Sequence, residues 1–201
     1  MRLANQGHYL EAETILKGLI ASNPGDADSE LALGELYYRF GYFDAALAPL
    51  SRDLELRPGD RRARILRAVC LFKTGSGTQA VAATEQLLAE NPPPNDIDLT
   101  LSYAQYLYEH RELDLALAQA RSAADFAPQH PIAYFWLSRI LLQKGDIVPA
   151  EEAAERSVAL APQLPFARNL LVRIYRLQGR TGDAEREAEW LRTYEARKAA
   201  P

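Results

Sequence analysis

Apolar residues recur along the chain in short helical stripes that Gly and Pro residues separate. The clearest stripe lies within residues 41–60, where the apolar positions share one face of a helix: Phe43, Ala46, Leu47, Leu50 and Leu54. Gly41 precedes this stripe and Pro58 follows it, and both residue types mark helix ends. The pattern predicts one helix here, with one exception, because the charged residue Asp53 falls on the apolar stripe.

The same pattern returns with a period of 34 residues. An Ala recurs one turn into each predicted second helix: Ala12, Ala46, Ala80, Ala116, Ala150 and Ala184. A Pro follows these helices at Pro24, Pro58, Pro92, Pro128 and Pro162. A helix-breaking Gly precedes them at Gly7, Gly41, Gly75, Gly145 and Gly179, and Arg111 takes this position in the fourth unit. A single spacing of 36 spans residues 91–96, which we expect to form a linker.

A repeat of this length and residue order resembles the tetratricopeptide repeat family. The second unit carries the resemblance best: Leu33, Gly34, Tyr37, Ala46, Leu50 and Pro58. Other units have Ala or Val at the Gly34 position or lose an aromatic residue. The resemblance covers nearly the whole chain. It implies an all-α fold, a right-handed α-solenoid of antiparallel helix pairs with about five and a half repeats.

One repeat domain over residues 1–201 is predicted, because no helix pair can bury its apolar stripe without its neighbours. The predicted repeats are 1–26 (partial), 27–60, 61–94, 97–130, 131–164 and 165–201. Only the segment MRLANQ remains of a first helix in the first repeat. Either the natural chain begins inside a repeat or, as we favour, the chain is a fragment of a longer protein. The last helix has a polar outer side and is expected to act as a C-terminal cap.

Composition and charge exclude several classes of function. Apolar residues make up 48% of the chain and charged residues 25%, as in globular domains. The formal net charge of -4 argues against nucleic-acid binding. No apolar run reaches about 18 residues, so no membrane insertion is predicted. The first residues do not form a signal peptide, which favours the cytoplasm and leaves the periplasm open if a signal was removed. Arg-rich, Lys-poor usage favours a bacterial source.

Residues suited to catalysis or metal binding do not gather in the sequence. His8, His110 and His130 belong to different repeats, lie at or beside predicted turns, and show no metal-ligand spacing. Cys70 lies between apolar neighbours in a predicted helix and is expected to be a buried packing residue. We therefore predict a protein that is not an enzyme and uses no cofactor or metal.

The resemblance implies a groove, lined by the first helices of successive repeats, that binds a peptide or a partner helix. The positions that the family uses for such a groove are Leu31, Glu35, Tyr38, Ile65, Val69, Phe72, Leu101, Gln105, Tyr108, Phe135, Arg139, Leu142, Asn169, Arg173 and Arg176. Tyr38, Phe72 and Tyr108 recur once per repeat, so the middle of the groove is expected to be apolar and aromatic. The alternative is that these apolar residues pack on other helices of the solenoid itself or on a domain outside the given sequence.

The charge along this predicted groove indicates the kind of partner. Glu35 lies near its beginning, whereas Arg139, Arg173 and Arg176 lie near its end. We expect a protein or peptide partner that is amphipathic and has an acidic end. The residues differ from those that hold an EEVD-type chaperone tail in relatives, so such a tail is not expected. The predicted function is a protein-binding scaffold; the alternative is a structural spacer or assembly segment of a larger bacterial protein in export, secretion or an enzyme complex.

Asp53 occupies a position where the resemblance implies a small apolar residue facing the next repeat. The first helix of that repeat carries Arg64 and Arg67, also in place of apolar residues. A lone buried charge is very costly, whereas a paired charge is tolerated. We therefore predict that Asp53 pairs with Arg64 or Arg67 between the second and third repeats.

Overall fold

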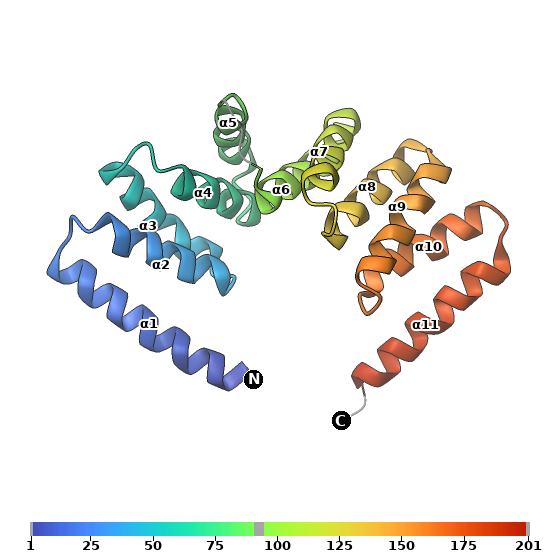
Figure 1. Cartoon of the computed structure of the whole chain (residues 1–201), viewed down its shortest axis with the longest axis horizontal. Coiled ribbons are helices and arrows are strands. Elements are labelled where there is room, and N and C mark those ends of the chain that lie inside the picture. Colours follow the sequence, from blue (N-terminus) through green and yellow to red (C-terminus); the bar gives the residue numbers. More distant parts are fainter. Residues whose placement is uncertain (1, 91–94, 200–201) are drawn as a thin grey trace. The chain divides into compact units, whose positions relative to one another are not determined.

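The protein is all-α in the computed structural model, which describes residues 2–90 and 95–199 (Figure 1). Within these residues it has eleven helices: α1 (Arg2–Ser22), α2 (Ala27–Arg39), α3 (Phe43–Leu56), α4 (Arg61–Lys73), α5 (Gly77–Leu88), α6 (Ile97–Glu109), α7 (Leu113–Phe126), α8 (Pro131–Lys144), α9 (Ile147–Leu160), α10 (Pro165–Leu177) and α11 (Thr181–Ala199). Successive helices pack as antiparallel pairs, such as α2 with α3 and α8 with α9. The predicted all-α fold of antiparallel helix pairs is confirmed.

The contacts between residues divide the chain into two compact units. Unit 1 is Met1–Ser102 and unit 2 is Tyr103–Pro201. The helices α2, α4, α6, α8 and α10 begin where the predicted repeats begin: Ala27, Arg61, Ile97, Pro131 and Pro165. That the repeats form a single domain stays a prediction. Pro92 and most of the expected linker at residues 91–96 lie outside the described residues.

Short polar side chains and left-handed residues set the helix ends. The carboxylate of Asp26 accepts a hydrogen bond from the Ser29 amide at the start of α2 (3.2 Å), and Asp60 accepts one from the Ala63 amide at the start of α4 (3.0 Å). Gly145 ends α8 with φ 89°, where a residue without Cβ avoids a steric penalty. These local signals explain why the breaks between helices follow the sequence pattern closely.

The stop predicted at Gly7 is wrong, because α1 runs through this residue from Arg2 to Ser22. A glycine inside a helix costs only about 1 kcal/mol relative to alanine, so it does not end a helix by itself. Gly41 ends its helix because its backbone turns left-handed (φ 79°) and α3 folds back onto α2. α1 continues through Gly7 without such a turn.

Small residues let the helices of unit 1 approach closely around a buried core. Leu50 and Cys70 are fully buried and belong to one cluster with Leu33 and Leu66. A Cβ placed on Gly34 would lie 2.6 Å from the side chain of Leu50, so only glycine permits this distance between α2 and α3. Burial raises the pKa of the Cys70 thiol to about 11, as expected for the packing role predicted from the sequence.

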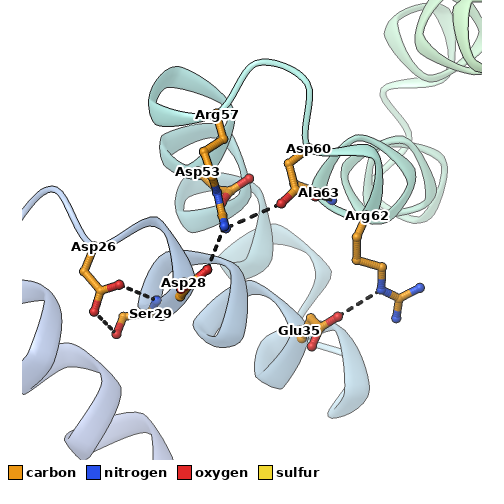
Figure 2. A network of polar contacts seen from close by, with 9 residues as sticks. All are labelled: Asp26, Asp28, Ser29, Glu35, Asp53, Arg57, Asp60, Arg62 and Ala63. Carbon is orange, nitrogen blue, oxygen red and sulfur yellow. Dashed lines mark hydrogen bonds and ion pairs between the residues drawn. The ribbon is translucent and has the colours of Figure 1, made fainter.

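Asp53 is fully buried but pairs with Arg57, so the predicted partners Arg64 and Arg67 are wrong (Figure 2). The Arg57 Nε donates to Asp53 Oδ1 at 3.0 Å. Arg57 Nη1 also donates to Asp28 on α2 at 2.6 Å, and its Nη2 lies 3.4 Å from the carboxylate of Asp60 at the start of α4. Arg57 therefore joins α2, α3 and α4 through one guanidinium group.

The two expected partners have other contacts. Arg64 forms an ion pair with Glu90, and Arg67 Nε donates to Ser51 Oγ at 3.1 Å. The prediction missed Arg57 because it considered only the facing helix. Arg57 lies four positions after Asp53, immediately beyond the last residue of α3, and this spacing places the two side chains on the same side.

Candidate functional site

Four of the residues predicted to line the groove are core residues. Ile65, Val69, Leu101 and Leu142 each expose less than a tenth of their surface. Ile65 and Val69 pack in a cluster with Leu87 of the second helix in their repeat. These four side chains therefore pack inside the protein itself, which was the alternative to the groove, and they are not available to a partner.

In unit 1 the aromatic residues predicted for the groove are half-buried against the chain itself. Tyr38 and Phe72 pack against the cluster that contains Val69. The Tyr38 hydroxyl donates a hydrogen bond to the carboxylate of Asp98. Burial, with this hydrogen bond, raises the pKa of Tyr38 well above its ordinary value. Tyr38 is thus held in place by α4 and the start of α6, while Leu31 beside it stays partly exposed.

The acidic residue predicted for the beginning of the groove is already neutralised. Arg62 Nε donates to Glu35 Oε1 at 2.9 Å (Figure 2). The Nη1 of Arg62 lies 3.6 Å from Asp96 Oδ2. These pairs link the first helices of successive repeats within unit 1. They leave Glu35 without a free charge to attract a basic partner.

Unit 2 gathers aromatic rings around one cation. The Arg139 guanidinium carbon lies 4.9 Å from the ring centre of Tyr108, 5.0 Å from that of Trp136 and 6.0 Å from that of Phe135. Phe166 on α10 continues the group, with its ring centre 4.9 Å from that of Phe135. We call Tyr108, Phe135, Trp136, Arg139 and Phe166 the Arg139 aromatic cluster.

Arg139 forms no ion pair or hydrogen bond with a carboxylate in the part of the chain that the structure describes. Its side chain is half-buried, and the ring faces attract its charge without neutralising it. The cluster can therefore offer a fixed guanidinium and an apolar surface to the same ligand. Such a combination suits a carboxylate that has an apolar neighbour.

The other residues of unit 2 that were predicted to line the groove have fewer fixed contacts than the Arg139 aromatic cluster. Asn169, Arg173 and Arg176 are exposed on α10. The charge of Arg176 helps to lower the pKa of Glu185, after the larger effect of the hydrogen bond from Arg192. Gln105 donates to Glu109 on its own helix at 2.8 Å. Arg173 thus adds positive charge to α10, the first helix of the last repeat. Its side chain is not held by aromatic rings as that of Arg139 is.

Two members of the cluster, Trp136 and Phe166, were not predicted. Trp136 directly follows Phe135, so simple repeat counting assigned only one of the two rings to the groove. Phe166 is the second residue of its repeat, and its aromatic character was the available signal. Trp136 is mostly buried and still contributes a ring edge to the cluster.

Among the described residues, no group of three His, Cys, Asp or Glu side chains could hold a metal ion. None of the described helices has the length and apolar character that a membrane span requires.

Two protein families match the chain by sequence. The family described as tetratricopeptide repeat matches residues 101–165, and that described as anaphase-promoting complex, cyclosome, subunit 3 matches residues 5–87. The chain is a tetratricopeptide-repeat protein. Tetratricopeptide-repeat domains in general bind proteins and peptides. No curated protein sequence matches the chain.

Solved structures similar to this tetratricopeptide-repeat protein share its fold at low identity. PilW, a widely conserved type IV pilus biogenesis factor, is 18% identical with a TM-score of 0.80, covering 96% of this chain and 89% of PilW. The pilF protein of Pseudomonas aeruginosa is 13% identical with a TM-score of 0.80, covering 98% and 91%. A double mutant of MamA RS-1 is 18% identical with a TM-score of 0.73, covering 87% and 97%. At these identities the likeness establishes the fold alone.

Proposed function

We propose that this tetratricopeptide-repeat protein is a non-catalytic scaffold that binds an acidic segment of another protein at the Arg139 aromatic cluster. The observation that carries the proposal is the state of Arg139, which lies over three rings and has no carboxylate partner in the described part of the chain. The general protein-binding role of the family agrees with it.

Physical chemistry favours a carboxylate as the group recognised. A guanidinium donates two parallel hydrogen bonds to a carboxylate, and such bonds between charged groups are stronger than neutral ones. The aromatic rings hold Arg139 before binding, so less side-chain entropy is lost when the partner arrives. Rings of Tyr, Trp and Phe also supply the apolar contact area that dominates many protein interfaces.

The charges of unit 1 support the assignment to unit 2. Glu35 and Arg62 already form a pair, and the Tyr38 hydroxyl is bonded to Asp98. In unit 2, Arg139 on α8 and Arg173 on α10 supply positive charge on the first helices of their repeats. A partner segment with an Asp or Glu next to an aromatic or aliphatic residue would complement this surface.

Peptide selection against the full chain tests the proposal. Random 12-residue peptides would be selected, and the affinity of individual peptides measured by fluorescence polarisation. We expect enrichment of peptides with Asp or Glu beside apolar residues. Arg139→Gln should weaken their binding by about tenfold or more, which corresponds to about 1.4 kcal/mol.

Arg156→Gln is the matched control, because Arg156 also lies over a ring in unit 2 but over that of Tyr134, at 5.8 Å. This variant should bind the selected peptides as the unaltered protein does. Selection of peptides without acidic residues, or equal affinity of the Arg139→Gln variant, would contradict the proposal.

A further inference from the structure

A recess of about 470 Å³ lies in unit 1 between α1, α2 and α3. Its walls are mainly apolar and include Ile20, Leu33, Ala48 and Pro49. The carboxylate-bearing residue in this wall is Glu30 of α2, which exposes only 8% of its surface. The volume lies in the range of small-molecule sites, which are mostly apolar with a few placed polar groups.

The recess is a repeated feature of the fold. Unit 2 has one of about 280 Å³ lined by Arg121, Tyr134, Leu137, Leu141 and Arg156. These residues lie 104 positions after Lys17, Glu30, Leu33, Tyr37 and Arg52, which line the larger recess. A third recess, of about 240 Å³, has Arg64 at the position of Glu30. Of these three recesses, the largest is the one in which this position carries the short side chain of Glu30.

The three equivalent residues also differ in how their polar groups are satisfied. The Tyr134 hydroxyl donates to the Pro128 carbonyl oxygen at 3.3 Å, and Arg64 pairs with Glu90. The carboxylate of Glu30 accepts no hydrogen bond from any residue that the structure describes. Burial raises the pKa of Glu30, because the charged form is less well hydrated in the recess than in water.

The cations near this recess have carboxylate partners of their own. Lys17 Nζ lies 2.7 Å from Glu13 Oε1, and Arg52 Nη1 lies 2.6 Å from Glu55 Oε2. The charge of Arg52 lowers the pKa of Glu30, but the combined effect of burial and of the nearby carboxylates Asp53 and Asp26 is larger. Glu30 is left as a mostly buried residue that lines an apolar space, and its carboxylate accepts no hydrogen bond from the described residues.

We propose that this recess binds a primary ammonium group carried on an apolar stem, with Glu30 as its counter-ion. The ammonium would supply the hydrogen bonds that the carboxylate lacks, and the apolar walls would cover the stem. A buried carboxylate with a bonded cation is far less costly than one without. The group could be a free arylalkyl amine or the lysine side chain of a partner protein, which share this chemistry. The inference is independent of the Arg139 aromatic cluster.

The test uses the full chain at neutral pH with two probes that have the same stem. Phenethylamine carries the ammonium group, and 2-phenylethanol replaces it with a hydroxyl. Binding is measured from the shifts of backbone amide NMR signals during titration. We expect shifts in α1, α2 and α3 and an affinity for the amine at least about tenfold above that for the alcohol. Equal affinities for the two probes would overturn the role of the ammonium.

Variants separate the carboxylate from the cavity. Glu30→Gln keeps the shape and should weaken amine binding about tenfold or more, to the level of the alcohol. Glu30→Trp places a large ring in the recess, as Tyr134 does at the equivalent position of unit 2, and should abolish binding of both probes. Glu11→Gln is the control, since Glu11 is exposed on α1 outside the recess. Unchanged amine binding by Glu30→Gln, with its folding verified by thermal unfolding, would overturn the proposal.

A short peptide with one lysine and blocked ends distinguishes the two sources. Tighter binding of the peptide than of phenethylamine, with the same loss in Glu30→Gln, supports a partner's lysine. Binding of the amine alone with that loss supports a small molecule. Binding of both probes without any dependence on Glu30 counts against the site.

Discussion

Arg57 balances three carboxylates where α2, α3 and α4 meet. Its partner Asp53 is fully buried, whereas the Asp28 side chain is 89% exposed. The buried Asp53 Oδ2 atom accepts no hydrogen bond from any residue of the described segments 2–90 and 95–199. The stability lost on removal of Asp53 should therefore differ from that lost on removal of Arg57.

Arg57→Ala is expected to destabilise unit 1 more than Asp53→Ala does. Removal of Arg57 leaves the Asp53 carboxylate buried without a cation, which is the costly outcome. Removal of Asp53 leaves Arg57 partly exposed and still bonded to Asp28, so the cost is roughly 1 kcal/mol. The measurement is urea unfolding of both variants and of the double variant, which should match Asp53→Ala. A larger loss for Asp53→Ala than for Arg57→Ala would contradict this account.

Arg111 takes a backbone conformation that its side chain disfavours. Its φ is 66°, and it stands where other repeats have Gly. The turn between α6 and α7 imposes this conformation whatever residue is present. Arg111 therefore adopts the left-handed backbone conformation of the glycines in the other repeats, and its side chain makes that conformation strained.

Arg111→Gly is expected to stabilise the protein by about 1 kcal/mol, because the left-handed region costs an L-residue about that much more than glycine. For a chain of this size the melting temperature should rise by about 2–4 °C. The control is Gly145→Ala, which places a Cβ at φ 89° and should lower the melting temperature. A fall in the melting temperature of Arg111→Gly in calorimetry would show that the side chain has a stabilising contact.

At the scale of the helix, side-chain volumes at the contact within each pair vary in opposite directions. Gly34 of α2 faces the fully buried Leu50 of α3. The corresponding residues of the later pairs are Ala68 and Thr84, Ala104 and Ala120, Ser138 and Ala154, and Val172 and Ala188. The smallest residue on the first helix thus accompanies the largest on the second. Such a pattern is expected where paired helices pack at a similar distance with different residues at the contact.

Gly34→Ala is expected to cost about 1–3 kcal/mol, since the new methyl group overlaps the Leu50 side chain. Leu50→Ala alone should cost about 2–5 kcal/mol through loss of buried volume. In the double variant the overlap disappears, so the combined loss should be smaller than the sum. Chemical unfolding of the three variants measures this coupling, and additive losses would contradict the proposed contact.

At the scale of the whole molecule, the repeat pattern accounts for the order and length of the described helices from α2 onward, whereas α1 continues through the predicted stop at Gly7. Both units contain helix pairs of the tetratricopeptide type, and similar solved structures cover nearly the entire chain. The role as an assembly segment of a larger protein stays a prediction beside the scaffold proposed above. Exposed apolar side chains on α1, such as Ile15 and Leu19, would suit a covering partner in either case.

The sequence alone determined the helices, because their ends depend on local features: caps such as Asp26 and Asp60, prolines at first helical positions, and the 34-residue period of apolar residues. It could not separate Ile65 and Val69, which are core, from Phe135 and Arg139, which are partly exposed, because all four occupy first-helix positions of one kind. Only the tertiary structure decided which partner Asp53 takes, that three rings surround Arg139, and that Glu30 faces an open recess. Helix formation depends on neighbours in the chain, whereas burial and charge pairing depend on side chains from other helices that converge in space.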